Sequence, residues 1–269
     1  MTETPSTSGP VPADAGTAAR DEHRFGRWIE RSDGRDFPYY DSVPPVITGA
    51  RWLLVVLSCI VGFAVLATVG FADQRAELVP RFLFLAIPAA VFIWASRGRW
   101  RALFKPVKAS DVGAMVVFWL INLVVSALAA ALVSGGEFSH LNANTVTDDL
   151  ADAGAGQIAA FYVGTGIQLM GEEIFTILPF LAILWFLSQR GLSRRTSVII
   201  AWVATAVWFG AAHLPTYDWN VAQAILVIGA ARLVLTLAYI RTKNLWVSFG
   251  AHVLNDWTTF TLVLVAATR

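Results

Sequence analysis

Residues 52–71 read WLLVVLSCIVGFAVLATVGF, an apolar run of 20 residues without a charged side chain. A helix needs about 20 predominantly apolar residues to cross the hydrocarbon core of a bilayer. Hydrophobic residues make up 56% of the 269-residue chain and charged residues 14%, and further apolar runs follow this one. The sequence therefore predicts an all-α, polytopic membrane helix bundle in contact with the lipid bilayer, and it excludes a disordered chain.

Seven apolar runs are predicted to form transmembrane helices. They cover residues 52–71, 82–96, 112–133, 157–187, 196–213, 221–240 and 245–267. As a helix, residues 157–187 would be about 46 Å long, against about 30 Å of hydrocarbon. We therefore expect this helix to bend, break or protrude. Pro179 is the weak point, because it removes the backbone hydrogen bond to Phe175.

Basic residues gather in segments that share one side of the membrane if the helices alternate. These segments are residues 24–51, 97–108, 190–195 and 241–243. The loop 134–156 falls on the other side and has no Lys or Arg; its acidic residues are Glu137, Asp148, Asp149 and Asp152. By the positive-inside rule, the amino terminus is expected in the cytoplasm and the carboxyl terminus outside.

Differences in composition along the chain predict two regions. Residues 1–45 are predicted to form a disordered or juxtamembrane cytoplasmic tail, and residues 46–269 the membrane domain. A net charge of +1 argues against nucleic acid as a partner, and the single Cys59 excludes a disulfide framework. The 17 Arg against 3 Lys, in an Ala-rich chain, favour a GC-rich bacterial source, and hence a multi-pass protein of the plasma membrane.

The last four runs contain ionisable side chains, and the first three contain none. Each one at membrane depth costs a few kcal/mol and needs a reason. The set comprises Glu172, Glu173, His213, Arg232, His252 and Asp256. Structural pairs would be the alternative explanation, and Arg232 could also extend toward water. Two adjacent glutamates and two histidines on three separate runs favour a functional site.

These residue types suit hydrolysis without a Ser or Cys nucleophile. Glu172 and Glu173 project about 100° apart on a helix, so that one can serve as a general base with His213 beside a shared water. His252, Asn255 and Asp256 lie on neighbouring positions of the last run and could stabilise an oxyanion or hold an ion. Glu172, His213 and His252 could alternatively bind zinc, although no two histidines are four residues apart as in HExxH.

Three segments resemble the motifs of a known family. GEEIF at 171–175, FGAAH at 209–213 and HVLND at 252–256 are similar to the EExxxR, FxxxH and HxxxN/D motifs of the CAAX protease and bacteriocin-processing family. These intramembrane proteases are also called Rce1-like or Abi proteins. The resemblance covers about residues 155–265. It implies an intramembrane endopeptidase similar to CAAX prenyl protease 2, with a hydrophobic or membrane-anchored peptide as substrate.

The resemblance also implies roles for individual residues. Glu172 would activate the water with His213, Glu173 would support it, and His252 with Asn255 or Asp256 would form the oxyanion side. The family has been described both with and without a metal. We favour the metal-free mechanism, with zinc on Glu172, His213 and His252 as the alternative.

One motif residue departs from the family pattern, and the estimated depths of the site residues disagree. The motif arginine is replaced by Ile177, and we hypothesise that Arg232 holds Glu173 from another helix; the alternative is that Arg232 pairs with Asp256. Counting about 1.5 Å per residue from the cytoplasmic ends places Glu172 and His213 about 24 Å deep but His252 only about 12 Å deep. The helices must therefore shift relative to one another if these side chains are to meet.

Two other functions remain open at this point. A proton- or ion-coupled transporter would use the buried charges as a pathway, although the first three runs carry no matching set. A non-catalytic immunity or scaffold protein of the same fold would explain the missing motif arginine. Within the enzyme interpretation, peptide maturation, bacteriocin self-immunity and processing of membrane regulators are equally compatible with the sequence.

Overall fold

The described part of the chain is entirely helical. The structure, a computed structural model, describes residues 24–40, 47–73, 75–144, 150 and 153–267. Within these residues it contains seven α-helices and no strand. The helices are α2 (Gly49–Thr68), α3 (Leu78–Ala95), α4 (Ala109–Ser134), α5 (Ala155–Gln189), α6 (Arg194–Ala212), α7 (Gly229–Thr242) and α8 (Leu245–Ala267).

Six helices among the described residues are long and apolar enough to cross a membrane, with the π-helical turn Gln223–Ile228 and α7 forming one of them. α8 also has 23 residues, but His252, Asn255 and Asp256 make it more polar. Each predicted run corresponds to one helix, with ends shifted by a few residues. The predicted polytopic bundle is confirmed, and the chain is a multi-pass membrane protein.

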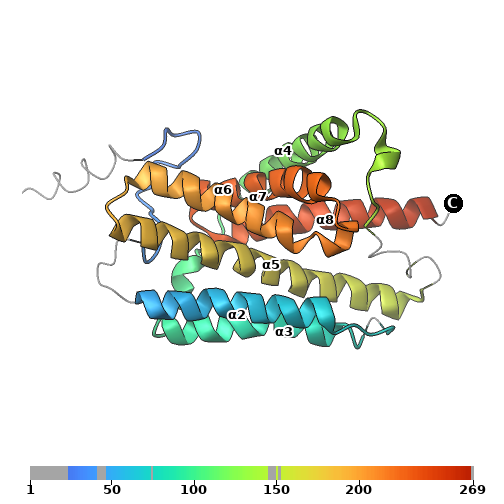
Figure 1. Cartoon of the computed structure of the whole chain (residues 1–269), viewed down its shortest axis with the longest axis horizontal. Coiled ribbons are helices and arrows are strands. Elements are labelled where there is room, and N and C mark those ends of the chain that lie inside the picture. The colour runs from blue at the N-terminus through green and yellow to red at the C-terminus, as the bar shows by residue number, and fades with distance from the viewer. Residues whose placement is uncertain (1–23, 41–46, 74, 145–149, 151–152, 268–269) are drawn as a thin grey trace, which may run out of the picture.

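α5 is the central helix of the bundle. It packs against α2, α3, α6 and α8, and it lies between the α2–α3 pair and the remaining helices (Figure 1). Residues 171–182 of α5 are all buried, the acidic doublet included. Helices in a membrane are held together mainly by close packing and by polar contacts between them. The doublet therefore lies in the most buried of the candidate membrane helices.

α5 does not break at Pro179, contrary to one of the expected outcomes. The helix runs without interruption for 35 residues. Pro179 cannot donate to the carbonyl of Phe175, and the indole Nε1 of Trp208 on α6 donates to this carbonyl instead, at 3.2 Å. A helix of about 52 Å exceeds the hydrocarbon thickness, so α5 accommodates its length by tilt or protrusion.

The basic segments meet at one end of the bundle. Arg31 of the amino-terminal segment pairs with Asp111 at the start of α4, and Lys105 donates its backbone N–H to Asn244 before α8 at 3.0 Å. Arg241 donates to the carbonyl of Arg27 at 3.0 Å. Residues 24–40, whose fold the sequence did not predict, thus pack against the helix ends.

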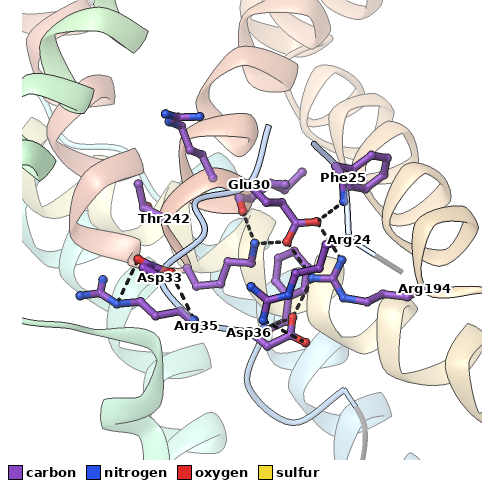
Figure 2. A network of polar contacts seen from close by, with 12 residues as sticks. Arg24, Phe25, Glu30, Asp33, Arg35, Asp36, Arg194 and Thr242 are labelled. Carbon is purple, nitrogen blue, oxygen red and sulfur yellow. Dashed lines mark hydrogen bonds and ion pairs between the residues drawn. The ribbon is translucent and has the colours of Figure 1, made fainter. Parts of the chain in front are cut away.

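Glu30 is the centre of this packing (Figure 2). It accepts hydrogen bonds from Arg194 Nη1 and Nη2, both at 2.8 Å, and from Lys243 Nζ. Burial alone would raise the pKa of Glu30, but the hydrogen bonds and charges of Arg194 and Lys243 outweigh it and hold this pKa at about 2. Burial lowers the pKa of Lys243 to about 8. Figure 2 shows Arg194 and Asp36 converging on the same cluster.

At the other end of the bundle, the segments predicted to lie outside the cytoplasm contact one another. Asn142 exchanges two hydrogen bonds of 2.8 Å with the side chain of Gln223, and its Nδ2 donates to the carbonyl of Tyr217 at 2.6 Å. The alternation of the helices is therefore as predicted, whereas the cytoplasmic assignment of the basic end stays a prediction. Residues 1–20, Pro44, Pro45, Asp148, Asp149 and Asp152 lie outside the described residues.

Candidate functional site

The candidate site is built by four elements of the carboxyl-terminal half. α5 carries the acidic doublet, α7 carries Arg232, α8 carries His252 with Asn255 and Asp256, and His213 directly follows α6. A π-helical turn precedes α7, and such turns are frequent at functional sites because they rotate the residues that follow.

Glu173 and Arg232 form a buried, two-bonded ion pair. Arg232 Nη1 lies 2.7 Å from Glu173 Oε1, and Nη2 lies 3.0 Å from Oε2. Both side chains are completely buried. Arg232 also donates from Nε to Thr236 at 3.2 Å and lies over the ring of Phe209. The hypothesis that Arg232 holds Glu173 is confirmed, and the alternative pairing with Asp256 is wrong.

His252 connects this pair to the other carboxylates. Its Nδ1 lies 3.0 Å from Glu173 Oε1, and its Nε2 lies 3.7 Å from both Glu172 Oε2 and Asp256 Oδ2. Because an ionised Glu173 can only accept, Nδ1 is the donor of this hydrogen bond. Nε2 is therefore the ring nitrogen directed at Glu172 and Asp256.

The expected difference in depth between the doublet and His252 is absent. The estimate assumed that every helix starts at the same level, but α8 starts inside the protein. Lys243, Asn244 and Leu245 are at most 1% exposed. The amino-terminal segment covers them, with Glu30 accepting from Lys243. His252 is therefore deeper than its distance along α8 indicates.

Glu172 has a different environment from its neighbour. Its Oε1 accepts a hydrogen bond from Gln168 Nε2, one turn earlier on α5, at 2.9 Å. Its side chain lines a cavity, whereas Glu173 lines none of those described. The angle between consecutive helical residues thus divides the doublet into a buried structural carboxylate and an accessible one. Sequence reasoning missed Gln168, because an uncharged residue four positions from a glutamate carries no distinctive signal.

His213 is oriented by its own helix end. Its Nδ1 lies 2.8 Å from the carbonyl oxygen of Phe209, so that Nδ1 donates and Nε2 keeps its lone pair. The two rings are 4.5 Å apart. Gly210 allows α6 to approach the π-helical turn, since a Cβ there would lie 2.5 Å from the carbonyl oxygen of Ala224.

Two adjoining cavities meet at these residues. The larger, of about 790 Å³, is lined by Glu172, His213 and His252 together with Arg232, Asn255 and Asp256. The smaller, of about 320 Å³, shares Gln168, Glu172, Phe209 and His213 with it. The expectation that the three motifs converge on one cavity is confirmed.

Apolar and aromatic side chains form much of the wall of the smaller cavity, among them Phe63, Leu66, Phe84 and Phe175. Arg81 also lines it, 5% exposed, with the carbonyl of Phe161 3.5 Å away. The first three apolar runs contain no ionisable residue, as predicted, but the helices start before the runs and add Arg51 to α2, Arg81 to α3 and Asp111 to α4.

Asn255 and Asp256 form a hydrogen-bonded pair beside the larger cavity. Asn255 Nδ2 donates to Asp256 Oδ1 at 2.9 Å, and Asp256 is partly accessible. The amide keeps a second N–H that is free to donate to a ligand.

Zinc on Glu172, His213 and His252 stays a prediction. Among the described residues, no group of three or more His, Cys, Asp or Glu side chains is arranged to hold a metal ion. His252 Nε2 lies 3.7 Å from Glu172 Oε2, and Nδ1 of each histidine has a protein partner, which leaves Nε2 as the ring nitrogen that faces the site.

The segment that carries the site also matches a family model. Residues 154–258 match the model described as type II CAAX prenyl endopeptidase Rce1-like. No curated protein and no solved structure matches the chain. The matched segment contains all the site residues of α5 to α8, in agreement with the resemblance of the three motifs. Residues 154–258 of this chain are therefore similar to the Rce1-like family.

Proposed function

We propose that the protein is an intramembrane endopeptidase that hydrolyses a peptide bond in a hydrophobic or membrane-anchored peptide. The observation that carries the proposal is the division of the acidic doublet. Glu173 is fully engaged by Arg232 and His252, whereas Glu172 lines both cavities together with His213. The Rce1-like match supports a peptidase at the family level. The Arg- and Ala-rich composition, typical of a GC-rich bacterial source, supports the plasma membrane as its location.

The catalytic base in this proposal is Glu172. A water between Glu172 and His213 would give a proton to Glu172 and direct its other O–H at His213 Nε2. The resulting hydroxide attacks the carbonyl carbon of the peptide bond. Protonated Glu172 then returns the proton to the leaving nitrogen as the C–N bond breaks, so that proton and charge balance without a covalent intermediate.

The oxyanion side is assigned to α8. His252 in its imidazolium form can donate from Nε2, and Asn255 can donate from the N–H that Asp256 does not use. Asp256 acts as a positioning residue, because it accepts from Asn255 and faces His252. Glu173 and Arg232 fix the other side of the imidazole.

The cavities favour an apolar substrate. The aromatic wall of the smaller cavity would take an apolar side chain or lipid chain, while the larger cavity, which Asn255 and Asp256 line, would take the peptide backbone. The shared wall contains Glu172 and His213, so the scissile bond would lie where the two cavities meet.

Peptide cleavage in liposomes tests this proposal. The purified protein is reconstituted and incubated with a panel of unmodified hydrophobic peptides and with a farnesylated CAAX peptide, and products are identified by mass spectrometry. We expect cleavage of at least one peptide, incorporation of one oxygen from ¹⁸O-water at the new carboxyl, and no loss of rate with EDTA or 1,10-phenanthroline. Ion flux without cleavage would favour a transporter, and the absence of both would favour a scaffold.

A further inference from the structure

Asn122 on α4 is a buried polar residue that the mechanism above does not use. Its side chain is 0% exposed, and neither the oxygen nor the nitrogen of its amide has a hydrogen-bond partner among the described residues. It lines the larger cavity, in which Glu172, His213 and His252 lie. α4 is outside the segment that matches the Rce1-like family.

The position of this amide separates it from other unpaired groups. Several buried side chains in the described part have an unpaired polar atom, but Asn122 is the one among them that also lines either cavity. α4 is otherwise the least buried of the candidate membrane helices. An unpaired buried amide destabilises a fold, and an apolar residue of similar size would remove this cost. The fold alone gives no reason for an asparagine at this position.

The chemistry of the amide indicates what it binds. A primary amide offers donors and an acceptor side by side. A simple anion would satisfy only its N–H groups, and a cation only its oxygen. An extended peptide presents the N–H and C=O of one residue toward the same side, so it can satisfy both. A peptide backbone at membrane depth also needs partners, because bulk water does not reach it.

We propose that Asn122 is a substrate-positioning residue that holds the backbone of an extended peptide by a pair of hydrogen bonds in the larger cavity. The inference rests on the proposed function, since it places the substrate of that reaction. Ser126, one turn later on the same face of α4, also lines the cavity. The peptide would therefore run along α4. This helix lies outside the family-matched segment that supplies the catalytic groups.

The test compares Asn122→Leu, which keeps the side-chain size but removes both hydrogen bonds, with the control Val124→Leu at an exposed position of the same helix. Cleavage of unmodified 12-residue peptides rich in Leu, Ala and Val is measured in liposomes. Binding of the same peptides, labelled with fluorescein, is measured in the Glu172→Gln background. Thermal stability is followed in parallel.

We expect Asn122→Leu to raise KM and Kd roughly tenfold, to leave kcat within about threefold, and to raise Tm by a few degrees. The control should change none of these quantities. Cleavage by the wild type with unchanged KM and Kd in Asn122→Leu would overturn the inference while leaving the proposed function intact. A lower Tm with unchanged Kd would assign Asn122 a purely structural role. Asn122-dependent binding without cleavage would instead contradict the hydrolase, and neither binding nor cleavage would contradict both.

Discussion

Arg232 on α7 holds Glu173 on α5 through hydrogen bonds of 2.7 and 3.0 Å across 59 residues of sequence. In the family motif the arginine stands four residues after the second glutamate, where this chain has Ile177. The guanidinium is therefore supplied by a different helix. Through His252, the same carboxylate also connects α5 to α8. Glu173 thus fixes the relative positions of three helices, and Glu172 is left to face the cavities.

The ion pair predicts strong coupling between its two residues. Arg232→Ala and Glu173→Gln should each destabilise the protein by about 3–5 kcal/mol, because each leaves a buried group without its partner. The double variant should lose little more than either single one. Unfolding in mixed micelles measures these differences. Arg232→Lys is the control, since a lysine cannot make both hydrogen bonds and should restore only part of the loss. Additive losses would contradict the pairing.

The hydrogen bond from Trp208 to Phe175 predicts a dependence on Pro179. Trp208→Phe removes the donor and should cost about 1–2 kcal/mol, because the carbonyl of Phe175 is then left unpaired. In a Pro179→Ala background the backbone N–H of residue 179 can take over, so the same substitution should cost clearly less. The two costs are compared by unfolding. Equal costs in both backgrounds would show that Trp208 does not compensate for the proline.

The approach of α6 to the π-helical turn predicts an effect of Gly210→Ala. The added Cβ would meet the backbone oxygen of Ala224, so one of the two segments must shift, at a cost of about 1–3 kcal/mol. Because His213 follows directly, the cleavage rate should fall as well. Gly113→Ala on α4, where a Cβ meets nothing within 4 Å, is the matched control and should be neutral or slightly stabilising. Equal behaviour of the two variants would refute this packing.

Acid pH should release the amino-terminal segment. The pKa of Glu30 is about 2 in the folded protein against an ordinary value of 4.5. A carboxyl group with a lowered folded pKa contributes stability that is complete above 4.5 and is lost as the pH falls toward 2. Hydrogen exchange of residues 24–40, corrected for intrinsic rates, should therefore show full protection at pH 6 and weaker protection at pH 3.

The matched variants for this experiment are Glu30→Gln and Glu137→Gln. Glu30→Gln should show weak protection at both pH values, since the charge that Arg194 and Lys243 bind is absent. Glu137 is exposed, and its variant should behave as the wild type does. Protection that is independent of pH in the wild type would contradict the role of Glu30.

The sequence predicted the helices well because a membrane imposes a length on each apolar run. Charged residues such as Glu172 and Arg232 were easy to identify as candidate site residues, because charged residues are rare at membrane depth. Uncharged polar residues carry no such signal, so Gln168 and Asn122 were missed. Arg81 escaped because it stands at the boundary of its run.

Local sequence patterns also could not predict contacts between segments that are distant in the sequence. Glu30 and Lys243 are 213 residues apart, and their contact covers the start of α8. Without it, the depth of His252 could not be estimated correctly. The sequence suggested Arg232 as the partner of Glu173, but only the three-dimensional structure shows that Arg232 binds Glu173 and not Asp256.

The most direct measurement is the cleavage rate of Glu172→Gln, with Glu137→Gln as the control, on the peptide that the reconstituted wild-type protein cleaves fastest. Glutamine keeps the shape of the side chain and its contact with Gln168 but cannot accept the proton of water. The proposed mechanism predicts a rate at least about 100-fold lower with an unchanged unfolding temperature. A rate within about threefold of the wild type would contradict the assignment of Glu172 as the catalytic base.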